Sequence, residues 1–157
     1  MTGYRALAFP VMPPTFVPDD FHAPATFIGP GFRLEPLGPE HNERDHAAWM
    51  SSIEHIRATP GWEGEKWPYP MSLEENLADL IRHSEDFVAR RGFTFSILDA
   101  EDVIGCVYIY PGNSGEVEVS SWVTAERASL DRVVWKTLGD WLDSDWPFAS
   151  VSYASRD

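Results

Sequence analysis

The chain has 157 residues, of which 43% are hydrophobic and 13% aromatic, and this is enough for one domain with a substantial core. Its 25 acidic residues outnumber the 12 basic ones and give a formal net charge of −13. Such a charge would repel the phosphates of nucleic acids and of anionic membrane surfaces. Nucleic acid and membrane are therefore not expected as partners, and a cationic or neutral small molecule is favoured.

The single cysteine, Cys106, stands in the apolar run VIGCVYIY, where a buried hydrophobic role is expected rather than a disulfide. No apolar stretch reaches the roughly 20 residues of a bilayer-spanning helix. The N-terminus also lacks the basic start and apolar run of a secretory signal. We therefore expect a cytoplasmic protein.

Residues 1–31 are expected to form an N-terminal arm. They contain six of the 13 prolines, interleaved with phenylalanines. Proline interrupts helices and central strands, whereas so many aromatic side chains favour contact with a core. The sequence thus predicts an extended arm that lies across a single domain formed by residues 32–157.

The first half of that domain is expected to be mainly helical after one strand. Its predicted elements, in chain order, are a strand over 32–38, a helical region over 39–57, a loop over 61–70 and a helix over 72–90. The last helix has the clearest signal, because Ser72 and Glu75 form a capping-box pattern and leucines recur on one face.

The second half changes to a period of two residues, which is typical of strands. Its predicted elements are strands over 93–99, 102–111 and 116–123, a helix over 130–142 and a last strand over 148–155. The run DVIGCVYIYP is apolar throughout, as expected of a central strand that is covered on both faces. The order β-α-α-β-β-β-α-β predicts an α+β domain with a mixed, mostly antiparallel sheet and helices packed on it.

This order, with the runs FRLEPLG, DVIGCVYIYP and EVEVSSWVTAERASLDRVVWKTLGDWL, resembles the GNAT superfamily of acyl-CoA-dependent N-acyltransferases over residues 32–154. The resemblance implies the GNAT fold and transfer of an acetyl group from acetyl-CoA to a small-molecule amine. Family members usually continue beyond the strand that matches FASVSYAS with a helix and further strands. The chain is therefore expected to be a divergent, C-terminally short member, whose exposed sheet face is covered by the arm or by the second subunit of a homodimer.

In that family, the turn after the central strand reads Arg or Gln, two arbitrary residues, Gly, one arbitrary residue, then Gly or Ala. Its backbone amides bind the CoA pyrophosphate at a helix N-terminus. The matching run here is RASLDR, in which Leu130 and Arg132 replace small residues and Asp131 adds a negative charge. Basic side chains could compensate for this, or the run could simply begin an ordinary helix. The residues expected at the cofactor are Trp122, Val123, Arg127, Ala128, Ser129, Arg132 and Lys136.

Acetyl transfer to an amine needs a base that removes a proton before the nitrogen attacks the thioester. The resemblance assigns this role to a glutamate near the central strands, where Glu116 and Glu118 stand two residues apart. Glu118, nearer the strand centre, is the favoured base, and Tyr108 on the neighbouring strand is the expected proton donor. The ordinary alternative is a solvated strand face with acids, next to a tyrosine that only packs.

Aromatic residues of the loop over 61–70 are expected to bind the substrate. Trp62, Trp67 and Tyr69 would hold a cationic or flat molecule through cation–π contact, together with Tyr110. Alternatively, the loop only covers the core.

No metal site is expected. His41 and His46 in the run HNERDH are five residues apart, which is not the i, i+4 spacing of zinc-binding helices. A solvated, acid-rich helix start explains this run more simply.

The competing interpretation is a degenerate GNAT-fold protein that does not use CoA. Such a protein would bind a small molecule, or carry out different chemistry, in the same pocket, and its groove beside the run EVEVSSWV would be filled by the arm. The turn over residues 127–132 distinguishes the two interpretations.

Overall fold

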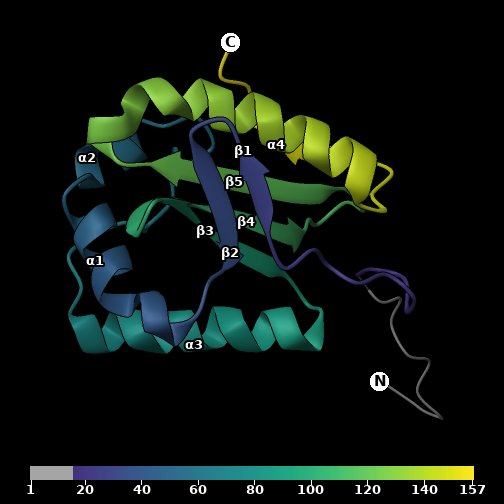
Figure 1. Ribbon diagram of the computed structural model, residues 1–157, viewed down its shortest axis with the longest axis horizontal. Helices are drawn as coiled ribbons and strands as arrows, with labels where there is room; N and C mark the ends of the chain where they lie inside the picture. Colours follow the sequence, from purple (N-terminus) through teal and green to yellow (C-terminus); the bar gives the residue numbers. More distant parts are fainter. Residues whose placement is uncertain (1–15) are drawn as a thin grey trace.

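The computed structural model describes residues 16–157 as a central sheet with helices on both sides (Figure 1). Helices α1 and α3 lie on one side of the sheet, and α4 lies on the other. The strands are β1 (Phe27–Gly29), β2 (Phe32–Pro36), β3 (Phe93–Asp99), β4 (Asp102–Pro111), β5 (Val117–Val123) and β6 (Val151–Tyr153). The helices are α1 (Asn42–Met50), α2 (Ile53–Arg57), α3 (Leu73–Ala89) and α4 (Asp131–Asp145), with 3-10 turns η1 (Pro39–His41) and η2 (Ala125–Leu130).

The six strands follow one another across the sheet in chain order. All neighbouring pairs are antiparallel except β5 and β6, which are parallel because α4 connects them. The predicted α+β class and the mostly antiparallel sheet are confirmed. Strand β1 was not predicted, because its three residues show no strand pattern of their own. It forms by pairing with β2, where Phe27 lies opposite Leu34.

The alternation of side chains along β5 divides the core into two parts. Val119 and Val123 face α4 and pack with Leu138, whereas Trp122 faces the opposite side and packs with Trp49 of α1. All five side chains are buried. The strand therefore joins the α4 side of the molecule to the side that carries α1 and α3.

The first described residues of the predicted arm lie at the C-terminal end of α4. Phe16 stacks on Phe148 with ring centroids 5.3 Å apart, and Phe21 contacts Trp146 at 5.2 Å. Arg90, which ends α3 with a left-handed backbone (φ 64°), donates hydrogen bonds to two carbonyls of this segment. Phe16 and Phe21 are therefore at this end of α4, whereas Gly31, the last residue of the predicted arm, lies beside Leu130 at the opposite end, where the cofactor turn was predicted.

The predicted helical region over 39–57 is divided into η1, α1 and α2. The backbone at Ser52 is not helical (φ −133°, ψ 22°), and its hydroxyl accepts a hydrogen bond from the Ala125 amide at 2.9 Å. The predicted capping box of α3 is confirmed, because the Ser72 hydroxyl and the Glu75 carboxylate each accept the other residue's amide.

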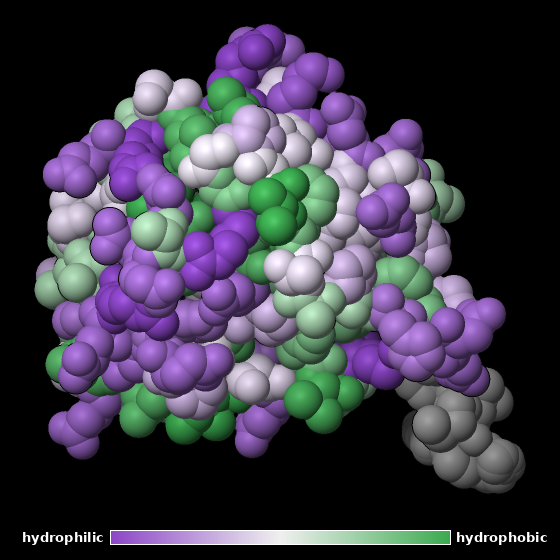
Figure 2. Space-filling view, viewed as in Figure 1, coloured by the Kyte–Doolittle hydropathy of each residue, from purple (hydrophilic) through white to green (hydrophobic). Residues whose placement is uncertain are grey.

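The surface in Figure 2 is mainly hydrophilic, with hydrophobic side chains in small, separate groups. None of the described helices combines the length and the apolar composition that crossing a membrane requires.

Candidate functional site

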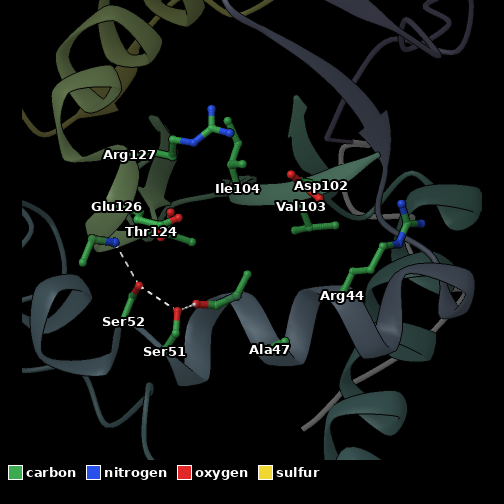
Figure 3. Close-up of a pocket in the computed structure, with 12 residues that line it drawn as sticks. Arg44, Ala47, Ser51, Ser52, Asp102, Val103, Ile104, Thr124, Glu126 and Arg127 are labelled. Atoms are coloured by element: carbon green, nitrogen blue, oxygen red, sulfur yellow. Dashed lines mark hydrogen bonds between the residues drawn. The ribbon is translucent and has the colours of Figure 1, made fainter. Parts of the chain in front are cut away.

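The turn predicted to bind the cofactor is wound into the 3-10 helix η2, which runs directly into α4. The Arg127 amide donates to the Thr124 carbonyl at 2.9 Å, and the Ala125 amide donates to Ser52, as the dashed line in Figure 3 shows. These backbone donors are therefore already bonded. A glycine-rich phosphate loop, in contrast, would turn its amides toward the ligand.

The three basic side chains expected at the cofactor point to different places. Arg127 pairs with Asp99 at 2.9 Å and lies at one end of a pocket between α1 and β4, opposite Arg44 (Figure 3). Arg132 pairs with Asp157, and Lys136 lines a hollow between α4 and β6. Of the other residues predicted here, Trp122 and Val123 are buried, and Ala128 and Ser129 are exposed.

The groove beside β5 is filled, and its occupant is the segment that follows β6. Beyond Val119, β5 is no longer paired with β6. The Ser121 carbonyl there accepts hydrogen bonds from Trp62 Nε1 and from Arg156 Nη2, both at 2.9 Å. The Arg156 side chain is only 3% exposed, and its Nε donates to Asp131 at 2.8 Å.

The resemblance of the sequence to the GNAT superfamily predicts a CoA-type donor, whose diphosphate needs hydrogen-bond donors near the start of α4. The residues there instead present the apolar side chain of Leu130 and the carboxylate of Asp131, whose Oδ1 is buried without a partner. Arg156 fills the adjoining groove. In this arrangement, the residues present do not fit the diphosphate.

An aromatic pocket of about 450 Å³ lies between α1, α3, β4 and the loop over 61–70. Trp62, Trp67, Tyr69 and Tyr108 line it, so the structure brings together three of the four predicted substrate residues. Three of these rings are in contact, with centroids 5.4 Å apart for Trp62 and Trp67 and 5.6 Å apart for Trp62 and Tyr108. Tyr110, the fourth, lies outside this pocket.

Asp45 also lines the aromatic pocket, and its carboxylate is buried, since the residue is only 4% exposed. Its Oδ2 accepts a hydrogen bond from Asn76 Nδ2 at 3.0 Å, and Asn76 Oδ1 accepts one from Trp49 at 3.1 Å. Burial raises the pKa of Asp45 from 3.8 to about 6, although the hydrogen bond from Asn76 and the nearby His41 and His46 act to lower it. No residue in the described range 16–157 forms an ion pair with it.

The predicted acid and base residues are not gathered at one point. Glu118 is exposed in a hollow next to the aromatic pocket, and Trp62 lines both spaces. Glu116 precedes β5, where its carboxylate accepts a bond from the Ser114 amide at 3.4 Å. The expectation that the two glutamates share a strand is therefore wrong, because the hairpin turn extends to residue 116.

The two tyrosines of β4 lie in different surroundings. The Tyr108 hydroxyl accepts a bond from Trp122 Nε1 at 3.0 Å, and burial raises its pKa well above its usual value, so it stays protonated. The Tyr110 hydroxyl donates to Asp86 at 2.9 Å and lies 2.8 Å from His83 Nδ1. Burial raises the pKa of Tyr110 to about 12.

Asp45 was not predicted as a site residue, because the run HNERDH was interpreted as a solvated helix start. A signal was available, because Asp45 precedes Ala48 and Trp49 by three and four residues and so shares their buried helix face. Arg156 carried no comparable signal. Within the described part of the chain, no group of three or more His, Cys, Asp or Glu side chains is arranged to hold a metal ion.

Solved structures with a similar fold are acetyltransferases. The ribosomal-protein-S5-alanine acetyltransferase from Vibrio fischeri is 15% identical with a TM-score of 0.57 over 74% of this chain. Mycobacterium smegmatis RimJ in complex with CoA-disulfide is 14% identical, with a TM-score of 0.61 over 80% of this chain. The GNAT domain of S. lividans PAT is 18% identical, with a TM-score of 0.52 over 72% of this chain. The chain spans less than two thirds of each, namely 66%, 62% and 64% of their lengths.

No family model and no curated protein sequence matches the chain. At these identities, the likeness defines the fold. The chain is a GNAT-fold protein, as the resemblance of its sequence implied.

Proposed function

We propose that the protein binds a small-molecule amine in the aromatic pocket and transfers an acyl group to its nitrogen. The observation that supports an amine ligand is the position of Asp45, whose buried carboxylate lies between aromatic walls. A buried charge without a cation is unfavourable, so a ligand that brings an ammonium group would relieve this cost.

The aromatic walls favour the same ligand. An ammonium group over the face of a tryptophan or tyrosine gains about 0.5–2 kcal/mol, with the larger value where water is excluded. Lys66 and Arg82 also line the pocket, but both residues are exposed, and Arg82 is paired with Asp79 at 3.0 Å. They therefore stand at the entrance, where they would meet the uncharged or anionic end of a ligand.

Acyl transfer is supported by the fold and by Glu118. The solved structures that resemble the chain are acetyltransferases, and one is a complex with CoA-disulfide. Glu118 lies in the hollow on the other side of Trp62 from the aromatic pocket, so it would accept the proton of an amino group that extends past Trp62 into that hollow. Some of these neighbours are named as ribosomal-protein acetyltransferases. The pocket described above favours a small acceptor here.

Calorimetric titration with primary amines, without any acyl donor, tests the amine site. We expect Asp45→Asn to weaken binding by at least about tenfold, because the buried ion pair is lost. Asp79→Asn is the matched control, since Asp79 lines the same pocket but is already paired with Arg82. Equal effects of the two substitutions would contradict the role given to Asp45.

A second candidate function is amine binding without acyl transfer. The observation that favours it is the filled groove beside β5, where Arg156 and Trp62 already bond to Ser121. Release of CoA thiol from acetyl-CoA in the presence of a bound amine distinguishes the two functions. Tight amine binding with no thiol release would select the second.

A further inference from the structure

We propose that His83 Nε2 is a second recognition point of the aromatic pocket, where it accepts a hydrogen bond from a hydroxyl group at the far end of the bound amine. This role rests on the proposed amine site at Asp45. It names the class of ligand, namely amines that also carry a hydroxyl group, and it involves no acyl donor and no rearrangement of the chain.

One face of α3 forms a wall of the aromatic pocket. Asn76, Leu80 and His83 all line the pocket, and their spacing of four and three residues places them on the same face of the helix. Asn76 Nδ2 donates to Asp45 Oδ2 at 3.0 Å, so Asn76 marks the part of the wall next to the proposed ammonium site. His83 follows Asn76 by seven residues, which corresponds to about 10 Å of helix. The ammonium site and His83 are therefore separated along one wall of the same pocket.

Hydrogen bonds behind His83 fix a proton on its Nδ1 atom. The Asp86 carboxylate accepts from Arg91 Nε and from the Tyr110 hydroxyl, both at 2.9 Å, so the single proton of Tyr110 is directed to Asp86. The Tyr110 oxygen lies 2.8 Å from His83 Nδ1, and with its own proton engaged it can only accept there. Nδ1 is therefore the donor, and the Thr94 hydroxyl oxygen, 3.0 Å away, is close enough to accept from it as well.

The other ring nitrogen of His83, Nε2, is left as a free acceptor. A neutral imidazole with its proton on Nδ1 has a lone pair on Nε2, and burial together with the nearby Arg82 lowers the pKa of His83, which favours this neutral form. Within residues 16–157, Nε2 has no hydrogen-bond partner, and it is not one of the fully buried atoms that lack one. Nε2 is therefore accessible, and it is the ring nitrogen available to a molecule in the aromatic pocket.

The surroundings of Nε2 favour a hydroxyl group over a charged group. A carboxylate has no proton to donate to Nε2. Among the described residues that line the pocket, the one acid besides Asp45 is Asp79, which is already paired with Arg82, so a second ammonium group would be poorly compensated. A hydroxyl group brings a donor without a charge, and the carbon atoms next to it can pack on Tyr108, whose ring centroid is 5.6 Å from that of His83. The pocket thus suits an ammonium group, an aromatic or apolar middle and a hydroxyl group.

Calorimetric titration with tyramine and with phenethylamine tests the role of His83, because these two amines differ only in the hydroxyl group. We expect wild type to bind tyramine about three- to tenfold more tightly, as one neutral hydrogen bond provides. In His83→Phe, which keeps a ring but has no acceptor, the preference for tyramine should disappear or reverse. His22→Phe is the matched control, since His22 is exposed and lies outside the pocket, and it should keep the preference of wild type.

Equal binding of the two amines by wild type would refute the role of His83. A preference for tyramine that survives in His83→Phe with a native circular dichroism spectrum would refute it as well. Should that variant lose its native spectrum, nitrogen NMR of labelled wild-type protein decides without a substitution. The His83 Nε2 resonance should shift further with tyramine than with phenethylamine, and equal shifts would overturn the proposal.

The same titrations separate the role of His83 from the proposed function. If wild type binds both amines equally and Asp45→Asn weakens both, the amine site stands and the hydroxyl site is refuted. If wild type binds neither amine, the proposed amine site fails, and the hydroxyl site fails with it.

Discussion

The indole nitrogen of Trp62 donates a hydrogen bond to the backbone carbonyl of Ser121 at 2.9 Å, across 59 residues of sequence. This bond ties the aromatic loop to β5. Because Trp62 lines both the aromatic pocket and the hollow that contains Glu118, one side chain separates the proposed amine site from the proposed base.

Trp62→Phe should destabilise the protein and weaken amine binding together. Phenylalanine keeps an aromatic ring but leaves a buried carbonyl with one donor fewer, at a cost of about 1–3 kcal/mol in unfolding free energy. Urea unfolding of the variant and titration with the amine check this. Trp135→Phe, on the outer part of α4, is the control and should leave amine binding unchanged. An unaltered unfolding midpoint for Trp62→Phe would show that the Ser121 bond is not important.

Amine binding should weaken as the pH falls below about 6. The ligand pairs with ionised Asp45, whose pKa burial raises to about 6, so the ionised fraction falls about tenfold for each pH unit below that value. His41, His46 and His83 also lie near or line this site, and burial lowers the pKa of His83.

Calorimetry between pH 5 and pH 8 measures this dependence. In Asp45→Asn, the affinity should be low and nearly independent of pH. If Asp45→Asn retains the pH profile of the wild type, the histidines and not Asp45 cause the pH dependence of binding.

The same carboxyl should make the ligand-free protein more stable in acid. The pKa of Asp45 is raised on folding, so the folded state holds a proton that the unfolded state releases. The resulting stabilisation is present below pH 3.8 and is lost as the pH rises through about 6. Asp45→Asn should therefore raise the unfolding free energy at pH 7 by up to about 3 kcal/mol. Denaturant unfolding at pH 5 and pH 7 checks this, and a destabilised variant at pH 7 would contradict it.

Glu118→Gln should lower turnover by about 100-fold or more, since the amide cannot accept the proton of the amine. Amine affinity should stay within about twofold, because the binding pocket lies on the other side of Trp62. Glu116→Gln is the matched control, as its carboxylate is bonded within the hairpin turn. A thiol-release assay at saturating amine measures both variants. Full turnover by Glu118→Gln would remove this residue from the mechanism.

Local patterns in the sequence were sufficient for most of the fold. The continuous apolar run of β4 reports burial on both faces, the alternation at the start of β5 reports burial on one face, and the capping box at Ser72 satisfies backbone donors within one turn of helix. All three depend on neighbours a few residues away, so they can be read directly. The aromatic loop was recognised for the same reason, since its composition by itself marks an aromatic surface.

The site depended on contacts between distant residues, which no local pattern reports. Asp45 meets Asn76 across 31 residues, Arg127 turns to Asp99 across 28, and Arg156 reaches Asp131 across 25. Each of these pairings decides whether a charge faces a ligand or another side chain. The sequence alone therefore predicted the aromatic loop and the strand, turn and helix of residues 117–142. Only the packing of the chain decided that the aromatic pocket has a buried acid and that Arg156 fills the groove beside β5.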